Sequence, residues 1–277
     1  MAEPGAGGGS RLGVIGWPVA HSLSPVFQNA GLAAAELEGW RYQRLPIPSE
    51  AFEETVRALP GAGFRGVNVT LPHKQRALAL ADQASDRARA IGAANTLLFE
   101  TSERAGSGVV IRADNTDAPG LISSLPFDPR GRSALVLGAG GVARAAVWAL
   151  LDAGAREVRI WNRTPERARR LAEELGGTVV SGAQPTDLLV NCTAHGLAGE
   201  RTLEGLPVSW DDLSGFGVVV DFVYRPQETA LIGAARAAGV PVLDGLELLL
   251  AQGVLSFEQF TGRPAPVAEM RAAIGLS

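Results

Sequence analysis

One short stretch, Asn68-Val69-Thr70-Leu71-Pro72-His73-Lys74, contains the side chain best suited to moving a proton. Lys74 is the only lysine of the chain, and the other 24 of the 25 basic residues (25 minus this one) are arginine. Arginine stays charged at any working pH, whereas the amine of a lysine can serve as an acid or a base. A lone lysine can also be a chance survivor, so its neighbours decide whether it is a catalytic candidate.

The neighbours of Lys74 favour a catalytic site. Residues 66–70 have the pattern of a strand, and Pro72 lies beside the start of a predicted helix that follows this stretch and runs to about Leu80. A strand-to-helix junction is where α/β proteins place their chemistry. Lys74 is therefore a candidate acid or base at such a junction.

Two other junctions carry polar groups. Ser22 and Ser24 follow a predicted strand at 11–15, and their hydroxyls could bind an anion or a sugar-like hydroxyl group. Alternatively, Ser24 is a helix N-cap with Pro25 at the first helical position, and both interpretations can hold together. The run from Asp114 to Asp117 offers two carboxylates and an amide after a predicted strand at 109–111, although such a run is also typical of a turn.

The composition excludes several classes of protein. The chain has 277 residues, of which 46% are hydrophobic and 19% charged, so we expect a large core and one or two domains. A net charge of −4 argues against a nucleic-acid surface, and no apolar run approaches the ~20 residues of a membrane span. Cys192 is the only cysteine, which fits a reducing cytoplasm, and the three histidines form no pattern of metal ligands.

Strands and helices alternate along the chain, which favours an α/β fold. A candidate domain boundary lies at 126–131, residues 1–10 read as a flexible tail, and 100–108 reads as a hairpin loop. Residues 82–91 and 118–125 are predicted helices, and 245–260 is a long apolar helix in which Gln252 is either a surface residue or directed into a cleft. Residues 92–97 are expected to turn into a strand. Further strands are predicted at 40–47, 133–137, 157–161, 178–180, 188–192, 218–223 and 240–243.

A glycine-rich turn opens the second half of the chain. Gly138, Gly140 and Ala143 follow the buried strand at 133–137 with the spacing G-x-G-x-x-A and lead into a helix. The first glycine allows the tight turn, the second lets the backbone approach a pyrophosphate, and the small third residue lets the helix pack on the strand. The helix N-terminus adds amide donors and a favourable dipole. This combination predicts a dinucleotide site.

The end of the next strand indicates which dinucleotide binds. An NAD site usually has an acidic residue there, but this chain has Asn162-Arg163-Thr164. A guanidinium without a carboxylate suits the 2′-phosphate of NADP, and Arg167, one helical turn later, could add a second contact. Alternatively, these arginines are solvated helix charges like the following Arg169 and Arg170. We favour NADP.

Together these motifs resemble the shikimate dehydrogenase family over nearly the whole chain. The resemblance implies an α/β protein of two domains, an N-terminal substrate domain with a mostly parallel sheet and a C-terminal Rossmann-type NADP-binding domain. The substrate domain would comprise 11–117 plus 245–277, and the NADP domain 118–244. The matching segments are 16–25, 68–74, 92–97, 115–117, 138–144, 162–164, 221–226 and 252–253.

The resemblance also assigns roles to residues. Lys74 and Asp117 would be the catalytic pair, and Ser22 and Ser24 would hold the substrate carboxylate. The remaining substrate contacts would be Thr70, Asn95, Tyr224 and Gln252. The cofactor contacts would be Gly138, Ala139, Gly140, Gly141, Val142, Asn162, Arg163, Thr164 and Arg167, with Phe222 and Gly245 near the nicotinamide and Asp86 as an additional candidate.

The implied reaction is the reversible NADPH-dependent reduction of 3-dehydroshikimate to shikimate in aromatic amino acid biosynthesis. The alternatives are a quinate/shikimate dehydrogenase of broader specificity, a related dehydrogenase for another cyclic hydroxy acid, and a non-catalytic NADP-binding sensor. Ala113, Ala118, Gln28 and Leu248 depart from the usual family residues. We expect a cytoplasmic monomer or homodimer that acts on a small molecule, without nucleic-acid or membrane partners.

Overall fold

The computed structural model describes residues 10–102, 108–224 and 228–276. Most of the predicted tail and the tip of the predicted hairpin loop therefore lie outside the described residues. The chain divides into two compact units, Met1–Thr116 with Gly253–Ser277, and Asp117–Gln252. The first unit is thus discontinuous in sequence, and residues 245–252, which the sequence placed with it, group with the second.

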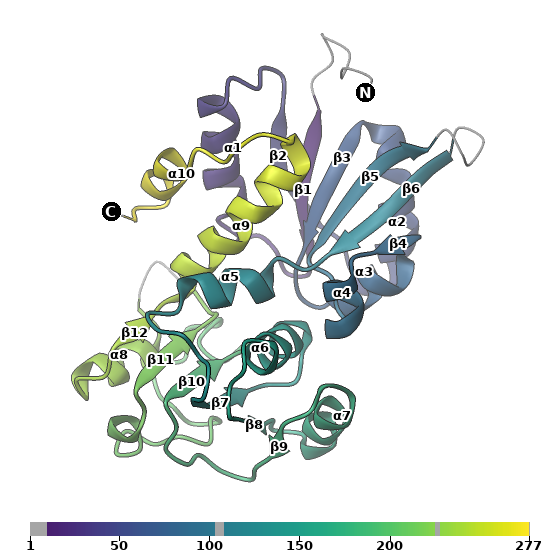
Figure 1. Ribbon diagram of the computed structural model, residues 1–277. Coiled ribbons are helices and arrows are strands. Elements are labelled where there is room, and N and C mark those ends of the chain that lie inside the picture. Colours follow the sequence, from purple (N-terminus) through teal and green to yellow (C-terminus); the bar gives the residue numbers. More distant parts are fainter. Residues whose placement is uncertain (1–9, 103–107, 225–227, 277) are drawn as a thin grey trace. The chain divides into compact units, whose positions relative to one another are not determined.

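The first unit is built on a six-stranded sheet in the order β2-β1-β3-β5-β6-β4 (Figure 1). β1 pairs in parallel with β2 and β3, and β4 with β6, whereas the β3–β5 and β5–β6 pairs are antiparallel. The mostly parallel sheet is confirmed. Its strands are β1 (Arg11–Gly16), β2 (Arg41–Pro46), β3 (Phe64–Val69), β4 (Gln83–Ala84), β5 (Thr96–Ser102) and β6 (Gly108–Asp114).

Helices cover this sheet. A core that includes Ile15, Phe52 and Val67 joins the strands to α2 and α3. Helices α1 and α10 lie side by side (Figure 1), where Gly31 leaves room for Met270. The helices of the unit are α1 (Ser24–Ala34), α2 (Phe52–Ala58), α3 (Lys74–Leu80), α4 (Asp86–Ile91), α10 (Val267–Ala273), the second half of α9 (Gly245–Thr261), and the short turns η1 (Ser49–Ala51) and η2 (Pro60–Ala62).

The prediction of one helix over 82–91 was wrong at its start. Residues 83–84 form β4, and α4 begins only at Asp86. The physical reason is Ser85, whose extended backbone and side-chain oxygen cap the helix by accepting a hydrogen bond from the amide of Ala88.

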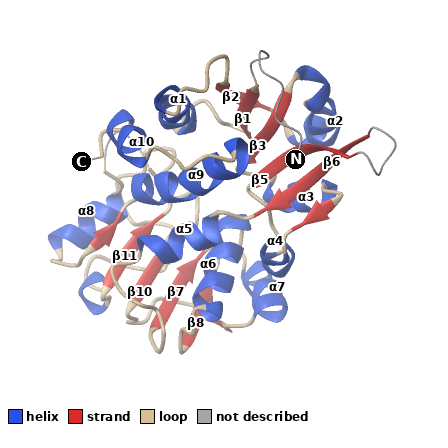
Figure 2. Ribbon diagram, turned by 45° about the horizontal axis from the view of Figure 1, so that its top comes forward, coloured by secondary structure: helices blue, strands red, loops and turns tan. Residues whose placement is uncertain are grey.

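The second unit has a six-stranded sheet in which every pair is parallel, in the order β12-β11-β10-β7-β8-β9 (Figure 1). Numbered within the unit, this is 6-5-4-1-2-3, the dinucleotide-binding order read from its other edge. The four central strands, β11, β10, β7 and β8, are also labelled in Figure 2. The strands are β7 (Ser133–Leu137), β8 (Glu157–Trp161), β9 (Thr178–Val179), β10 (Leu188–Asn191), β11 (Val218–Asp221) and β12 (Val242–Leu243).

Both faces of this sheet are buried. β7 is buried at all five positions, which explains its uninterrupted apolar sequence. One core packs the sheet against α5, α6 and α7, and the other packs it against α8. The helices are α5 (Asp117–Ser124), α6 (Gly141–Asp152), α7 (Pro165–Leu175), α8 (Ala230–Ala237), the short η4 (Leu213–Gly215) and the first half of α9. None of the described helices has the length and apolar character needed to cross a membrane.

Candidate active site

The ends of four strands meet at one edge of the first sheet, and the polar motifs follow or precede these ends. The amide of Thr70, just after β3, donates to Ile15 at the end of β1 (2.8 Å). The amide of Asn95, just before β5, donates to Asp114 at the end of β6 (3.1 Å). Backbone hydrogen bonds therefore bring the segments that carry Thr70 and Asn95 to the same edge.

The loop that carries Ser22 and Ser24, called the serine loop below, follows β1. Helix α1 begins at Ser24 with Leu23 in the cap position, so the predicted Ser24 N-cap is shifted by one residue. Instead, the hydroxyl of Ser22 accepts a hydrogen bond from the Ser24 amide (3.3 Å). Ser22 and Ser24 are both buried. The side chain of Arg44 on β2 donates from two nitrogens to the Ser22 carbonyl oxygen, at 2.9 Å from Nε and 2.6 Å from Nη2.

Lys74 is the first residue of α3 and is 7% exposed. Its carbonyl oxygen accepts a hydrogen bond from the amide of Ala94 (2.8 Å), which ties the start of α3 to the turn that carries Asn95. The preceding His73 is fully buried against Phe52, with ring centroids 4.5 Å apart. Lys74 is therefore placed on a well-packed helix start rather than on an exposed loop.

A buried hydrogen-bond network, which the sequence did not reveal, supports this edge. The amide oxygen of Asn68 accepts from the hydroxyl of Tyr42 (2.8 Å) and from that of Ser256 on α9 (3.3 Å). The side-chain nitrogen of Asn68 donates to the hydroxyl of Thr96 (3.2 Å). Because these groups are buried and hydrogen-bonded to one another, they fix β2, β3, β5 and α9 relative to each other within the unit.

Asn95 belongs to the same network. Its side-chain oxygen accepts from the amide of Thr116 (2.7 Å), and its side-chain nitrogen donates to the Thr116 hydroxyl (2.9 Å). Asp117, the next residue, is 6% exposed and begins α5. Lys74 and Asp117 belong to different units, so their pairing stays a prediction.

The glycine-rich turn of the second unit has the expected geometry. Gly138 has a φ of 115°, and a Cβ there would lie 3.1 Å from the carbonyl of Cys192. Gly140 occupies the N-cap position of α6 without a side-chain hydrogen bond, and a Cβ on it would meet nothing within 4 Å. Ala143 is fully buried where the helix packs on the sheet. Open space beside uncapped helix amides fits a pyrophosphate.

The arginines after β8 are exposed at the start of α7, with Thr164 as N-cap and Pro165 in the first turn. Asn162 donates to the Thr164 carbonyl (2.9 Å) and so shapes this turn. Within the described ranges, Arg163 and Arg167 form no ion pair, whereas Arg169 pairs with Glu166. Two uncompensated guanidinium groups at the end of the second strand fit a 2′-phosphate.

A second buried network, also not foreseen from the sequence, joins the ends of β10 and β11. The carboxylate of Asp221 accepts from the side chains of Asn191 (2.9 Å) and Thr229 (2.7 Å) and from the amide of Val223 (3.0 Å). Burial raises the pKa of Asp221 to about 6, although all three hydrogen bonds oppose this shift. Asp221 thereby fixes the loops on either side of the predicted nicotinamide residue Phe222.

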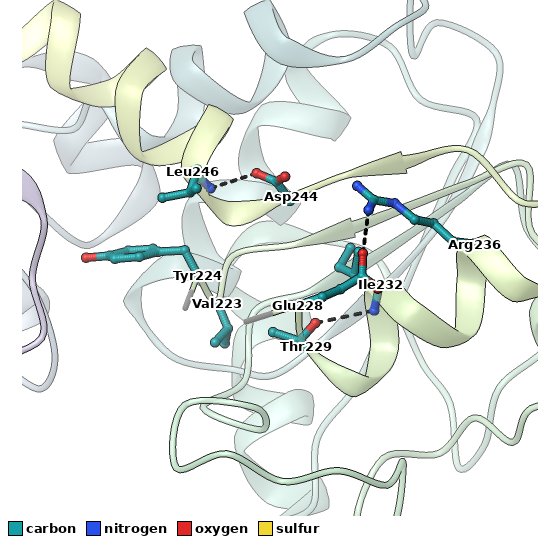
Figure 3. Close-up of a pocket in the computed structure, with 8 residues that line it drawn as sticks. All are labelled: Val223, Tyr224, Glu228, Thr229, Ile232, Arg236, Asp244 and Leu246. Atoms are coloured by element: carbon teal, nitrogen blue, oxygen red, sulfur yellow. Dashed lines mark hydrogen bonds and ion pairs between the residues drawn. The ribbon is translucent and has the colours of Figure 1, made fainter. Parts of the chain in front are cut away.

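A small pocket of about 160 Å³ lies beside these loops (Figure 3). Its wall includes an ion pair between Glu228 and Arg236, and Asp244 accepts a hydrogen bond from the Leu246 amide (3.0 Å). Tyr224 alone among the predicted site residues lines it, and its ring extends away from the ion pair (Figure 3). The pocket does not include the glycine-rich turn, so we do not identify it with the dinucleotide site.

Three predicted site residues remain, namely Gly245, Gln252 and Asp86. A Cβ at Gly245 would lie 2.6 Å from the carbonyl oxygen of Val223, so only glycine allows α9 to start this close to the β11 loop. Gln252 is half-buried on α9 and donates to the Leu249 carbonyl (2.6 Å). Asp86 is exposed and forms an ion pair with Arg89 (2.8 Å). Its predicted contact with the cofactor stays a prediction.

Family models match three segments of the chain. Residues 14–97 match the shikimate dehydrogenase substrate binding domain, 124–194 match shikimate/quinate 5-dehydrogenase, and 245–274 match the shikimate 5′-dehydrogenase C-terminal domain. Shikimate dehydrogenase (NADP(+)) of Nitrobacter winogradskyi is 44% identical over 274 residues, with 94% of each chain covered. The enzyme of the same name from Methylobacterium radiotolerans is 44% identical over 280 residues, covering 95% of this chain and 96% of the other.

Solved structures agree. Shikimate 5-dehydrogenase from Thermus thermophilus, crystallised with NADP(H) and shikimate, has a TM-score of 0.82 and 41% identity, covering 95% of this chain and 98% of its own. The ligand-free 5-ketofructose reductase of a Gluconobacter strain has a TM-score of 0.80 and 30% identity, covering 96% and 97%. The two sheets, the glycine-rich turn and these similarities lead to one conclusion: the chain belongs to the shikimate dehydrogenase family.

Proposed function

We propose that this protein is an NADP-dependent shikimate dehydrogenase, which reduces the ketone of 3-dehydroshikimate to shikimate and runs in reverse with NADP⁺. The observation that carries the proposal is the gathering of Ser22, Thr70, Lys74 and Asn95 on segments at one sheet edge, in a chain 44% identical to curated enzymes of that activity. The place of the reaction is aromatic amino acid biosynthesis.

The proposed cofactor site lies in the second unit. Amides at the start of α6 and the open space at Gly140 would hold the pyrophosphate, and Arg163 and Arg167 the 2′-phosphate. Asn162 and Thr164 shape the turn that presents the arginines, and the loops fixed by Asp221 carry Phe222 and Tyr224. When bound, NADPH supplies the hydride for the reduction.

The proposed substrate site binds the ring and manages the proton. The hydroxyls of Ser22 and Ser24 bind the substrate carboxylate. Four further residues bind the ring hydroxyls or the carboxylate, namely Thr70, Asn95, Tyr224 and Gln252. As the ketone is reduced, negative charge develops on its oxygen, and the ammonium of Lys74 stabilises this charge and donates the proton. Asp117 orients the ammonium. In the reverse reaction, the amine of Lys74 accepts the proton of the shikimate hydroxyl.

The test is a panel of four mixtures. Purified protein is combined with shikimate or quinate, each with NADP⁺ or NAD⁺, and the absorbance of the reduced nicotinamide is followed. We expect rapid turnover with shikimate and NADP⁺ only. Comparable rates with quinate or NAD⁺ would favour the broader quinate/shikimate dehydrogenase. NADP⁺ binding without turnover in any mixture would contradict the proposal and favour a sensor.

We further propose that the enzyme works in the cytoplasm, as a monomer or homodimer, on a small molecule and without nucleic-acid or membrane partners. A single cysteine and a net charge of −4 support this proposal. Size-exclusion chromatography with light scattering tests the oligomeric state, and a larger assembly would contradict it.

A further inference from the structure

The side chain of Arg44 contacts the serine loop through two hydrogen bonds. Its Nε and Nη2 atoms both donate to the single carbonyl oxygen of Ser22, at 2.9 and 2.6 Å. Arg44 is the residue of β2 that pairs with Val14 on β1, the strand that runs into the loop. Two hydrogen bonds from one planar group restrict both the position of the guanidinium and the position of the loop.

The described hydrogen bonds of the Arg44 side chain are to a carbonyl oxygen and not to a carboxylate. Other arginines of the first unit do form ion pairs, as Arg76 does with Glu53 and Arg87 with Asp114. Arg44 forms none with any carboxylate that the structure describes. The first turn of α1, which starts at Ser24, has no acidic residue and no side-chain cap. Among the described residues, no ion pair therefore neutralises the charge of Arg44 at the serine loop.

The serines alone cannot select a charged substrate. A hydroxyl donates a hydrogen bond to a carboxylate, an ester or another hydroxyl, so Ser22 and Ser24 would accept neutral and anionic groups alike. Discrimination needs a net charge near the loop, and Arg44 keeps its charge at every working pH. Because the residue is exposed, its field is weakened by solvent but remains felt over the few ångströms to the loop.

We propose that Arg44 is a specificity-determining residue, which fixes the Ser22–Ser24 loop and supplies the positive charge that selects a carboxylate over a neutral group on the substrate ring. The inference rests on the proposed function, in which that loop binds the shikimate carboxylate. Arg44 acts through the loop and through its charge and does not touch the reacting atoms.

The test compares binding of shikimate with binding of its neutral methyl ester by calorimetry. In R44Q we expect the dissociation constant of shikimate to rise about tenfold and that of the ester to change little, so that the preference for the anion falls about tenfold. R44K keeps the charge and should retain most of the preference. R41Q, at the other end of β2, makes the same charge change away from the loop and should bind both ligands as the parent does.

Two results would overturn the proposal. Equal weakening of shikimate and the ester in R44Q would mean that Arg44 only supports the loop, and unchanged binding of both would mean that it has no role. Raising the salt concentration should reduce the preference of the parent but not that of R44Q. Turnover by the parent is measured separately: binding of shikimate without turnover would contradict the proposed function while the ratio of the two dissociation constants still decides the role of Arg44.

Discussion

Lys74 is the residue on which the proposed chemistry depends most directly. It starts α3 in a buried position and is the only lysine of the chain. Lys74→Arg keeps a positive charge but removes an amine that can serve as an acid or a base. We expect turnover with shikimate to fall by about 10²–10⁴-fold while NADP⁺ binding stays unchanged, as measured by steady-state kinetics and calorimetry.

The comparison with Lys74→Met separates charge from proton transfer. If the ammonium acted only as a charge, Lys74→Arg would remain active and Lys74→Met alone would fail. Turnover near the parent value in Lys74→Arg would therefore refute the acid–base role. Circular dichroism of both variants checks that α3 is retained.

Arg163 should decide the choice between NADP⁺ and NAD⁺. It is exposed after β8 and forms no ion pair with any residue that the structure describes. Because a charge-assisted hydrogen bond contributes about 1.5–3 kcal/mol, Arg163→Gln should lower the preference of kcat/KM for NADP⁺ over NAD⁺ by about 10- to 100-fold. The rate with saturating NAD⁺ should stay close to the parent value.

Arg170→Gln is the matched control, because Arg170 is also exposed, on α7. It removes the same charge in the second turn of the helix rather than at the strand end, and should leave the preference nearly unchanged. An equal loss in both variants would mean that general positive potential, and not a contact from Arg163, selects the phosphate.

The residues with distinctive chemistry could be found from the sequence, whereas the residues that hold them could not. A single lysine, a glycine-rich turn and an arginine at a strand end each allow few interpretations of their function. In contrast, Ser256 and Asn68 share a hydrogen bond although they lie 188 positions apart. Serine and asparagine occur throughout most chains, so nothing in their type or spacing predicts that partnership before the fold is known.

At the scale of elements, His73 joins α3 to the segment before α2. Its Nε2 forms a hydrogen bond with the carbonyl of Ile47 (2.8 Å), and its ring stacks on Phe52. Its Nδ1 is buried and has no hydrogen-bond partner among the residues that the structure describes. Arg76, one turn later, donates to the carbonyl of Ser49. Burial lowers the pKa of His73 below its usual 6.5 and the nearby Arg76 lowers it further, although the hydrogen bond to Ile47 opposes the shift.

The lowered pKa of His73 gives a stability prediction with a definite sign. Below pH 6.5 the unfolded chain takes up a proton at this position before the folded chain does, so the folded state loses stability as the pH falls through that range. His73→Gln can still donate to Ile47 but does not titrate. We expect denaturant unfolding to show a steeper loss of stability below pH 6.5 in the parent than in the variant, and parallel curves would contradict the neutral buried ring.

Elements of the second unit were predicted more closely than those of the first. Strands β7 and β8 have the predicted bounds. For β7 the reason is that a parallel strand buried on both faces is a continuous apolar run. In the first unit, β6 extends from Gly108 to Asp114, well beyond the predicted 109–111. One face of that strand is more exposed and carries polar residues, so the sequence does not show a continuous apolar run over its full length.

At the scale of the whole molecule, the chain forms two compact units, and one boundary between them falls inside a helix. The division lies between Gln252 and Gly253 in α9, whereas the sequence placed it at residue 245. No change in composition marks the division, since α9 is one continuous apolar helix. Only the contacts of the folded chain show that three buried side chains after this point pack in the first unit, namely Phe257, Phe260 and Met270.

A cavity in the core of one unit should destabilise that unit more than the other. Phe257 is fully buried beside Gly31 in the first unit, and Leu150 is fully buried in the second. Phe257→Ala should cost about 3–5 kcal/mol and Leu150→Ala about 2–5 kcal/mol of folding stability. Hydrogen exchange should then be faster mainly in β1 and β3 for Phe257→Ala, and mainly in β7 and β10 for Leu150→Ala.

Saturating NADP⁺ sharpens this comparison, because a ligand stabilises only the states that bind it. If the second unit alone forms the cofactor site, NADP⁺ should slow exchange in β7 and β10 of both variants and leave β1 and β3 of Phe257→Ala unprotected. Protection of both sheets by NADP⁺, or equal acceleration of both by either cavity, would mean that the units unfold as one cooperative body. The division in α9 would then describe the native contacts without separating two stabilities.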